Sequence, residues 1–162
     1  MQGAPTPNVR TLRPADLASV VELDALLTGE TKQAYWDGIC KRFLRQKGGV
    51  ALGTFHEASD SDPRLDGYLF GELRAFEFGS EACGWVFAVG VRPDAARTGV
   101  GSALLAAARG RFRKLGVQAV RTMVRRTDVP LLSFFRRHGF VGGPFVQLEL
   151  DLPGDDLPEE HS

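Results

Sequence analysis

Cysteine is scarce in this chain. Its 162 residues include two cysteines, Cys40 and Cys83, which form neither a C-x-x-C pair nor a cluster with histidine. This spacing argues against a disulfide framework and gives no sign of a zinc site, so we expect no bound metal and a reducing compartment. The first twenty residues also lack a long apolar run. We therefore expect neither a signal peptide nor a membrane span, and we predict a cytoplasmic location.

The chain also lacks a net charge. It carries 20 Lys and Arg residues against 20 Asp and Glu residues, and 43% of its residues are hydrophobic. A neutral total argues against a domain that grips nucleic acid or an acidic membrane, so we expect neither as a partner. The basic residues are nevertheless concentrated, because the stretch from Arg92 to Arg137 has eleven of them and two acidic residues. Such a local positive field suits a compact anionic ligand, although solvated helix faces give the same pattern.

The length is typical of one domain that buries a core without disulfides or a structural metal. Residues 1–8 and 152–162 are rich in proline, glycine and charge, and the second segment contains an acidic run. We therefore expect a flexible N-terminus at 1–8, a single domain at 9–151 and an acidic flexible tail at 152–162.

Hydrophobic periodicity predicts six strands and four helices within that domain. The expected strands cover 9–12, 50–55, 67–76, 83–91, 117–124 and 145–150, and the expected helices cover 14–28, 31–45, 102–115 and 129–137. The resulting order, β-α-α-β-β-β-α-β-α-β, has a strand–helix–strand unit after antiparallel hairpin material. This order predicts an α/β (α+β) fold with a mixed, mostly antiparallel sheet and helices on both faces.

The most informative segment is VGVRPDAARTGVGSALL, from Val89 to Leu105. A buried strand leads through a proline-containing turn into Gly99-Val100-Gly101, which opens a helix. Glycines let a ligand approach the backbone, and the first turn of a helix presents N–H groups with a partial positive charge. With Arg97 alongside, the segment predicts a diphosphate site. A plain tight connection is the alternative, and a dinucleotide-binding turn fits poorly because Leu104 stands where its third glycine would be.

This segment resembles the signature of the GNAT superfamily of acyl-CoA N-acyltransferases. In that family a hydrophobic strand ends in V-x-P and leads into [RQ]-x-x-G-x-[GA] and a helix. Here the corresponding residues are Val91-Arg92-Pro93 and the stretch from Ala96 to Gly101. The stretch from Thr127 to Phe140 is similar to the family's second hallmark, a short helix that runs into G-F. RTLRPADLASVVEL near the N-terminus is similar to the family's opening strand and helix, so the resemblance covers nearly the whole chain.

The resemblance implies a GNAT-like fold and an enzyme that transfers the acetyl group of acetyl-CoA to a primary amine by direct attack in a ternary complex. It also implies a two-part binding site for this co-substrate. Free backbone groups of a splayed strand at Val89, Gly90 and Val91 would hold the pantetheine arm and polarise the thioester carbonyl, and Gly90 suits a distorted strand. The N–H groups of the following loop would hold the diphosphate; they belong to Arg97, Thr98, Gly99, Val100, Gly101 and Ser102.

The sequence departs from the family pattern at two positions. Phe135 stands where many members carry a tyrosine that protonates the leaving thiolate, and Ala96 stands where the loop usually begins with Arg or Gln. A thiol with an aqueous pKa of about 8.5 is a fair leaving group without an enzymatic acid. The departures leave open an alternative function, a catalytically weak acyl-CoA-binding or interaction module. The sequence also leaves a homodimer open.

The remaining candidate residues lie on the strand at 67–76 and between the first two helices. Glu72 is the better candidate for the general base, and Tyr68 on the same face is an alternative acid. Each has a structural alternative, an ion pair with a basic neighbour for Glu72 and core packing for Tyr68. The resemblance places substrate recognition in the connection between the first two helices. There Glu30 could attract a cationic amine, and Tyr35 could contact the substrate or serve in packing.

Overall fold

The structure, a computed structural model, describes residues 7–56, 63–75 and 77–152. Its contacts divide the chain into two compact units, one up to Arg125 and one from Arg126 onward. The segments predicted to be flexible, 1–8 and 152–162, fall almost wholly outside the described residues. The single domain at 9–151 stays a prediction.

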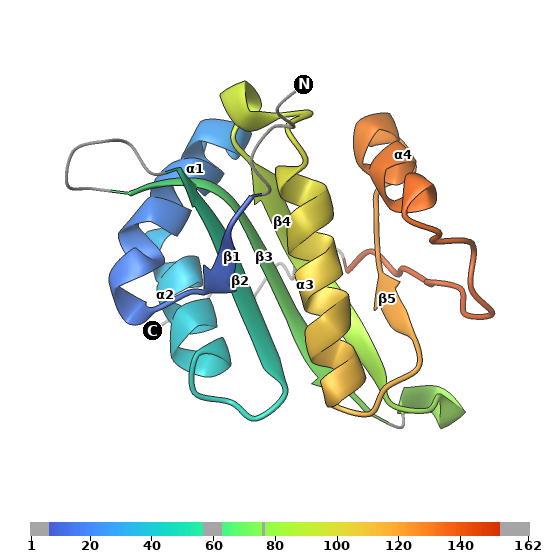
Figure 1. Cartoon of the computed structure of the whole chain (residues 1–162). Coiled ribbons are helices and arrows are strands. Elements are labelled where there is room, and N and C mark those ends of the chain that lie inside the picture. Colours follow the sequence, from blue (N-terminus) through green and yellow to red (C-terminus); the bar gives the residue numbers. More distant parts are fainter. Residues whose placement is uncertain (1–6, 57–62, 76, 153–162) are drawn as a thin grey trace, which may run out of the picture. The chain divides into compact units, whose positions relative to one another are not determined.

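The first unit is built on a five-stranded sheet in the order β1-β2-β3-β4-β5 (Figure 1). The strands are β1 (Val9–Thr11), β2 (Gly49–His56), β3 (Arg64–Arg74), β4 (Cys83–Val91) and β5 (Val120–Thr122). Neighbouring strands from β1 to β4 pair antiparallel, whereas β4 and β5 pair parallel. The predicted mixed, mostly antiparallel sheet is confirmed, with β5 much shorter than the strand expected at 117–124.

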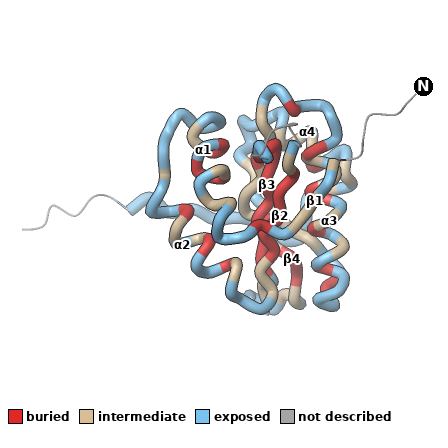
Figure 2. The backbone as a smooth tube through the Cα atoms, turned by 60° about the vertical axis from the view of Figure 1, so that its left-hand side comes forward, coloured by how far each residue is buried: buried red, intermediate tan, exposed pale blue. Residues whose placement is uncertain are grey.

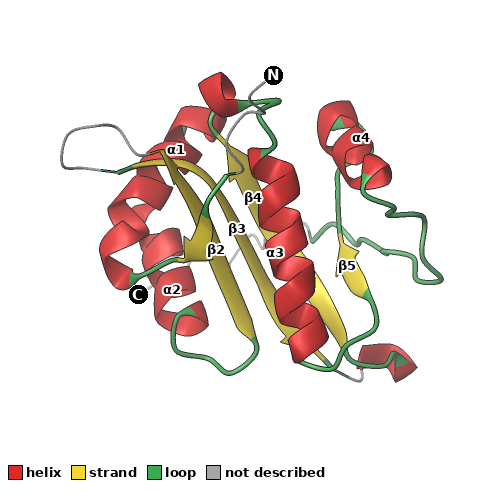
Figure 3. Ribbon diagram, viewed as in Figure 1, coloured by secondary structure: helices red, strands yellow, loops and turns green. Residues whose placement is uncertain are grey.

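Helices cover both faces of this sheet, as predicted (Figure 3). On one face, Tyr68 and Phe70 of β3 join a buried cluster with residues of α1 (Leu17–Thr28) and α2 (Gln33–Phe43). Gly67 and Gly71, which alternate with them along β3, lie against α3 (Val100–Lys114) on the other side of the sheet. Figure 2 shows the buried residues gathered along the central strands β2, β3 and β4. The core therefore lies in two layers, one on each side of β3.

Glycines let α3 approach the sheet closely. A Cβ added at Gly84 would lie 2.5 Å from the ring of Phe112, and one added at Gly71 would lie 2.8 Å from it. Phe112 is 1% exposed. Its ring therefore fills the space that side chains at these two positions would otherwise occupy, and it packs the end of α3 against β3 and the start of β4.

The backbone of β4 is interrupted by a bulge at Phe87. The register passes from Phe70 paired with Ala88 to Gly71 paired with Val86, which leaves Phe87 as the extra residue. The family resemblance implies a distortion nearer Gly90, but Gly90 pairs in regular register with Tyr68. A bulge shifts the alternation of the strand by one residue. The direction in which each β4 residue from Ala88 onward points therefore depends on this insertion.

The second unit contains the helix α4 (Val129–Arg137). Asp128 caps α4 by accepting the N–H of Leu131 at 3.1 Å, and Gly139 with a φ of 86° follows its end. The strand predicted at 145–150 is wrong, because the described residues of this unit include no strand. Its alternating apolar residues Val146, Leu148 and Leu150 are at least 79% exposed. Alternation supplies an apolar face, but a strand also needs a neighbouring strand to accept its hydrogen bonds.

Candidate functional site

The connection between β4 and α3 contains two residues in the left-handed region. Arg97 has a φ of 63° and Gly99 a φ of 87°. A non-glycine residue costs about 1–2 kcal/mol in this conformation, and strain of this kind is concentrated at ligand sites. Both residues and the neighbouring Ala96 are exposed, and a Cβ added at Gly99 would meet nothing within 4 Å. The loop therefore presents its backbone to open space.

The first turn of α3 presents backbone donors at the end of this loop. The first intrahelical hydrogen bond joins the N–H of Ala103 to the carbonyl oxygen of Gly99 at 2.9 Å. The N–H groups of Val100 and Gly101 lie ahead of that bond, where an α-helix has no acceptor for them and its dipole adds a partial positive charge. This geometry can bind an anion such as a diphosphate.

Ion pairs and hydrogen bonds anchor the start of the loop to β3. Arg64 reaches Asp94 at 2.8 Å and Asp66 at 2.9 Å. The N–H of Arg92 donates to the carbonyl oxygen of Asp66 at 2.7 Å. Within the loop, the hydroxyl of Thr98 donates to a carbonyl oxygen 2.6 Å away. These contacts tie the first residues of the loop to β3.

Part of β4 has a free backbone edge within the first unit. The short β5 pairs with residues 84–86 of β4, and no strand among the unit's described residues pairs with 87–91 on that side. The sheet therefore opens just after the bulge, toward the loop that leads into α3.

The phase of the β3–β4 ladder decides which residues point their backbone toward this free edge. Directly opposite residues of antiparallel strands alternate between pairs that exchange hydrogen bonds and pairs that do not. The bond from Arg92 to Asp66 marks a hydrogen-bonded pair. The register is regular from Ala88 to Val91, so hydrogen-bonded and non-hydrogen-bonded pairs alternate back along β4 from Arg92. Gly90 therefore turns its N–H and C=O groups to β3, whereas Val89 and Val91 turn theirs to the free edge.

Gly90 has a different role, because it lies against Tyr68. A Cβ added at Gly90 would lie 2.7 Å from the Tyr68 ring and 2.8 Å from Cδ1 of Leu27 on α1. The absent side chain lets the ring of Tyr68 and the end of α1 touch this stretch of β4. The structure thus brings Tyr68 next to the backbone predicted to bind the co-substrate.

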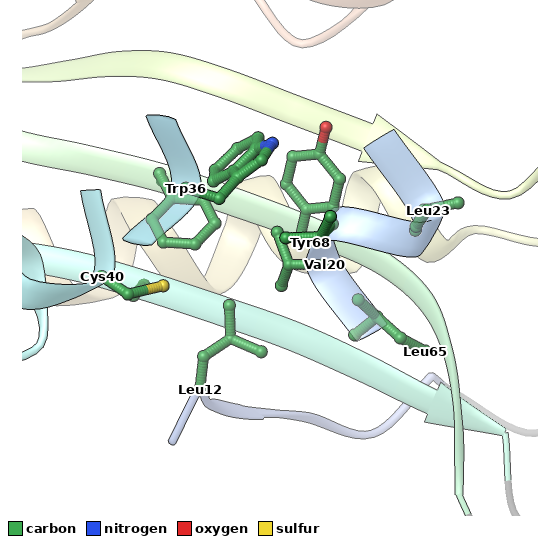
Figure 4. Close-up of a cluster of buried hydrophobic side chains, with 10 residues drawn as sticks. Leu12, Val20, Leu23, Trp36, Cys40, Leu65 and Tyr68 are labelled. Carbon is green, nitrogen blue, oxygen red and sulfur yellow. The ribbon is translucent and has the colours of Figure 1, made fainter. Parts of the chain in front are cut away.

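Tyr68 also belongs to a buried polar cluster, formed around Asp24, that the sequence analysis missed. The hydroxyl of Tyr68 donates to Oδ1 of Asp24 at 3.3 Å, and the indole N–H of Trp36 donates to Oδ2 at 2.9 Å. Nζ of Lys32 lies 3.0 Å from the same Oδ2. Figure 4 shows the indole nitrogen of Trp36 and the hydroxyl of Tyr68 at the same end of the hydrophobic cluster, away from Leu12.

A signal for Asp24 was present in the sequence. It follows Val20 and Val21 by three to four residues, so it occupies the apolar stripe of α1, where an acidic residue is unusual. Asp24 is 5% exposed. A charged residue on the buried face of a helix needs partners, and those partners identify the cluster.

The cluster sets the protonation states of its members. Burial raises the pKa of Asp24, but the hydrogen bonds from Trp36 and Lys32 outweigh it and leave the pKa below its ordinary value. Burial and the nearby Asp24 carboxylate raise the pKa of Tyr68 well above its ordinary value. Asp24 is therefore anionic at neutral pH, and Tyr68 keeps its proton. A phenol so perturbed is a poor acid for a thiolate whose conjugate thiol has a pKa of about 8.5.

Acid will remove the stabilisation that Asp24 provides. Because its pKa in the folded chain lies below the unfolded value of about 3.9, the contribution is complete above that value and is lost as the pH falls through the folded pKa. We expect Asp24→Asn to lower the free energy of unfolding by about 1–3 kcal/mol near neutral pH and by less in strong acid. Urea denaturation near neutral pH and in strong acid measures the loss of unfolding free energy at each pH. An equal loss under the two conditions would contradict the lowered pKa of Asp24.

Glu72 lies apart from this cluster. Its Oε1 accepts a hydrogen bond from Nε of Arg74 at 3.0 Å, and its Oε2 lies 3.5 Å from Nη2 of Arg42. The ion pair that was the structural alternative for Glu72 is confirmed. Four residues of strand, roughly 13 Å, separate it from Tyr68 along β3, so the structure does not bring the two predicted catalytic residues together.

The two predicted substrate-binding residues lie near the start of α2. Tyr35 is 49% exposed, and its ring packs edge-to-face on Trp36 with the centroids 5.2 Å apart. Glu30 is exposed in the connection between α1 and α2, where its backbone exchanges hydrogen bonds with the hydroxyl of Thr28. Tyr35 therefore lies beside a member of the Asp24 cluster.

Phe135, at the position of the missing tyrosine, is a packing residue of the second unit. Its ring lies edge-to-face on Phe140, with the centroids 4.9 Å apart, and the N–H of Phe140 donates to the carbonyl oxygen of Phe135 at 3.1 Å. A phenyl ring has no proton to give. This packing explains the G-F hallmark in structural terms, because Gly139 makes the turn that returns Phe140 to the helix.

Neither a metal site nor a membrane-spanning helix is present among the described residues. No group of three or more His, Cys, Asp or Glu side chains in that part of the chain could hold a metal ion. No helix there is long and apolar enough to cross a membrane.

The profile of the acetyltransferase (GNAT) family matches residues 27–140. The match spans more than half of the chain, which therefore belongs to the GNAT family of acetyltransferases. Among curated proteins, a mycothiol acetyltransferase from Saccharomonospora viridis is 27% identical over 112 residues. The alignment covers 67% of this chain and 37% of the relative, so the chain spans well under half the length of that protein.

Solved structures share the fold. An acetyltransferase from Trypanosoma brucei is 26% identical with a TM-score of 0.68, and the match covers 90% of this chain and 99% of the other. The aminoglycoside N-acetyltransferase AAC(6')-Iy, crystallised in complex with CoA, is 14% identical with a TM-score of 0.75, and the match covers 89% and 93% of the two chains. The second likeness concerns the fold alone.

Proposed function

We propose that this chain is an N-acetyltransferase that transfers the acetyl group of acetyl-CoA to a primary amine by direct attack in a ternary complex. One observation carries the proposal. The free edge of β4 at Val89 and Val91 continues directly into a strained, exposed loop and then into the first amides of α3. This run of backbone donors and acceptors matches a ligand with a polar amide arm at one end and a diphosphate at the other. Family membership and the CoA complex of AAC(6')-Iy support the same ligand.

Three parts of acetyl-CoA, the diphosphate, the pantetheine arm and the thioester carbonyl, have a proposed site on the chain. The diphosphate binds the loop and the first turn of α3, from Arg97 to Ser102, where the helix dipole favours negative charge. The pantetheine arm and the thioester carbonyl bind the free edge at Val89 and Val91. A backbone N–H there can donate to the carbonyl oxygen as negative charge develops on it.

The chemistry needs orientation more than a strong acid. The nitrogen of the neutral amine attacks the thioester carbon, so that an N–C bond forms and the C–S bond breaks. The proton lost by the nitrogen passes to solvent, and the thiolate leaves as such or takes a proton from water. We assign Tyr68 a positioning role rather than the role of the acid. Its pKa is raised and its hydroxyl donates a hydrogen bond to Asp24, so it keeps its proton.

A substitution separates the two roles open to Glu72. If Glu72 serves as an ion-pair partner, Glu72→Gln lowers the free energy of unfolding by about 1 kcal/mol and leaves kcat within about twofold. We expect this result, because both carboxylate oxygens face guanidinium groups. The measurements are urea denaturation and the pH profile of kcat. A fall in kcat of roughly 100-fold or more, with loss of the acidic limb of that profile, would make Glu72 the general base after all.

The test of the proposed function is release of free thiol from acetyl-CoA in the presence of a panel of amines. We expect thiol release that depends on the amine, with mass spectrometry showing one acetyl group on the amine for each thiol. Tight CoA binding without acetylation of any amine would support the second candidate function, an acyl-CoA-binding module. Phe135 is the observation that favours it, because it offers no acid.

A further inference from the structure

The Asp24 cluster contains one partner that differs from the others. Trp36 and Tyr68 are 2% and 3% exposed, are held in α2 and β3, and donate neutral hydrogen bonds. Lys32 is the cationic partner, its side chain is 33% exposed, and it lies ahead of α2 in the connection from α1. The carboxylate is thus fixed by two rigid donors and neutralised by a third group that reaches it from the surface.

The cluster lies beside the proposed path of the thioester. The ring of Tyr68 touches Gly90, between the two β4 residues whose backbone faces the free edge. Leu27, one turn after Asp24 on α1, touches the same glycine. The end of the Tyr68 ring therefore lies between the Asp24 carboxylate and β4, the strand proposed to hold the acetyl group.

Two exposed apolar side chains lie beside members of the cluster. Leu27, which touches Gly90, is 39% exposed, and Tyr35, which packs on Trp36, is 49% exposed. Apolar side chains near a buried carboxylate suit the apolar body of a ligand with a cationic head. Glu30, exposed in the same connection, adds a further negative charge.

We propose that Asp24 is the recognition site for the ammonium group of the amine substrate, and that Lys32 occupies this site until the substrate ammonium displaces it. The inference rests on the proposed function and names its substrate class, a primary amine that is cationic in water and carries an apolar group. Exchange of one ammonium for another leaves the charge of the buried site unchanged, so it avoids the cost of an unpaired buried carboxylate. The bound ammonium then gives one proton to water and attacks the thioester carbon as the neutral amine.

The test measures binding of phenethylammonium and of its neutral isostere 2-phenylethanol to the full chain saturated with CoA. For the unaltered protein we expect phenethylammonium to bind at least tenfold more tightly. Lys32→Met should tighten phenethylammonium about tenfold without changing 2-phenylethanol, because the competing ammonium is gone. Lys41→Met, at an exposed lysine on α2, is the matched control and should change neither. Asp24→Asn should abolish the preference for the cation.

The outcomes distinguish this inference from the proposed function. If the unaltered protein binds no CoA, the proposed function fails. If it binds CoA but shows no preference for phenethylammonium, or if Lys32→Met weakens or leaves unchanged its binding, the inference is overturned and the cluster is structural. Lys32 is partly exposed, so its variant keeps the test decisive even if Asp24→Asn does not fold.

Discussion

Replacement of Gly99 by valine is expected to weaken CoA binding by roughly 100-fold or more. Gly99 has a φ of 87°, a conformation that a β-branched residue adopts only with strain, and its Cβ would project into the open space in front of α3. Each charge-assisted hydrogen bond to the diphosphate is worth about 1.5–3 kcal/mol, and each 1.4 kcal/mol or so is tenfold in affinity. Loss of the bonds from Val100 and Gly101 accounts for the effect, which calorimetric titration with CoA measures.

Gly116 provides a matched control at the opposite end of α3. It has a φ of 82°, and a Cβ added there would also meet nothing within 4 Å. Gly116→Val should therefore carry a similar conformational cost, about 1–2 kcal/mol of unfolding free energy, while CoA binds normally. Equal losses of CoA affinity in the two variants, or normal affinity in Gly99→Val, would contradict the proposed diphosphate site.

Removal of the Phe112 ring is expected to cost about 3–5 kcal/mol of unfolding free energy. The ring is 1% exposed and lies on the bare backbone of Gly71 and Gly84, so its loss leaves a cavity between α3 and the sheet. Chemical denaturation of Phe112→Ala measures the effect. Because α3 carries the proposed diphosphate site, we also expect the variant to bind CoA more weakly at temperatures where it is partly unfolded.

A second substitution tests whether the glycine and the ring form one packing unit. Gly84→Ala places a Cβ 2.5 Å from the ring of Phe112 and should cost about 1–3 kcal/mol by itself. In the Phe112→Ala background the same methyl group enters the cavity, so the double variant should be more stable than the sum of the single losses indicates. Strict additivity would show that Phe112 and Gly84 do not share one space.

Local patterns predicted most of the first unit. The apolar stripes of α1 and α3 and the glycines that follow them mark helix ends that the structure confirms, because periodicity and positive φ are local properties. The segment at 145–150 shows the limit of such patterns. Its alternation is as regular as that of a true strand, but whether a partner strand lies beside it depends on contacts that a single segment does not encode.

The candidate site also has parts that local sequence patterns predict and parts that they do not. Gly99 and the start of α3 could be predicted, since a glycine-rich turn before a helix is a local anion-binding pattern. The bulge at Phe87 could not be predicted. Because of this bulge, the backbone groups of Val89 and Val91, rather than those of Gly90, face the free edge. The Asp24 cluster required three elements to meet, α1, the start of α2 and β3, and only its acidic residue on an apolar stripe was visible in advance.

The most direct test is a crystal structure of the chain with CoA. We expect diphosphate oxygens within hydrogen-bonding distance of the N–H groups of Val100 and Gly101, and the pantetheine arm along the backbone of Val89 and Val91. A nucleotide bound elsewhere, with the first turn of α3 facing solvent, would contradict this expectation.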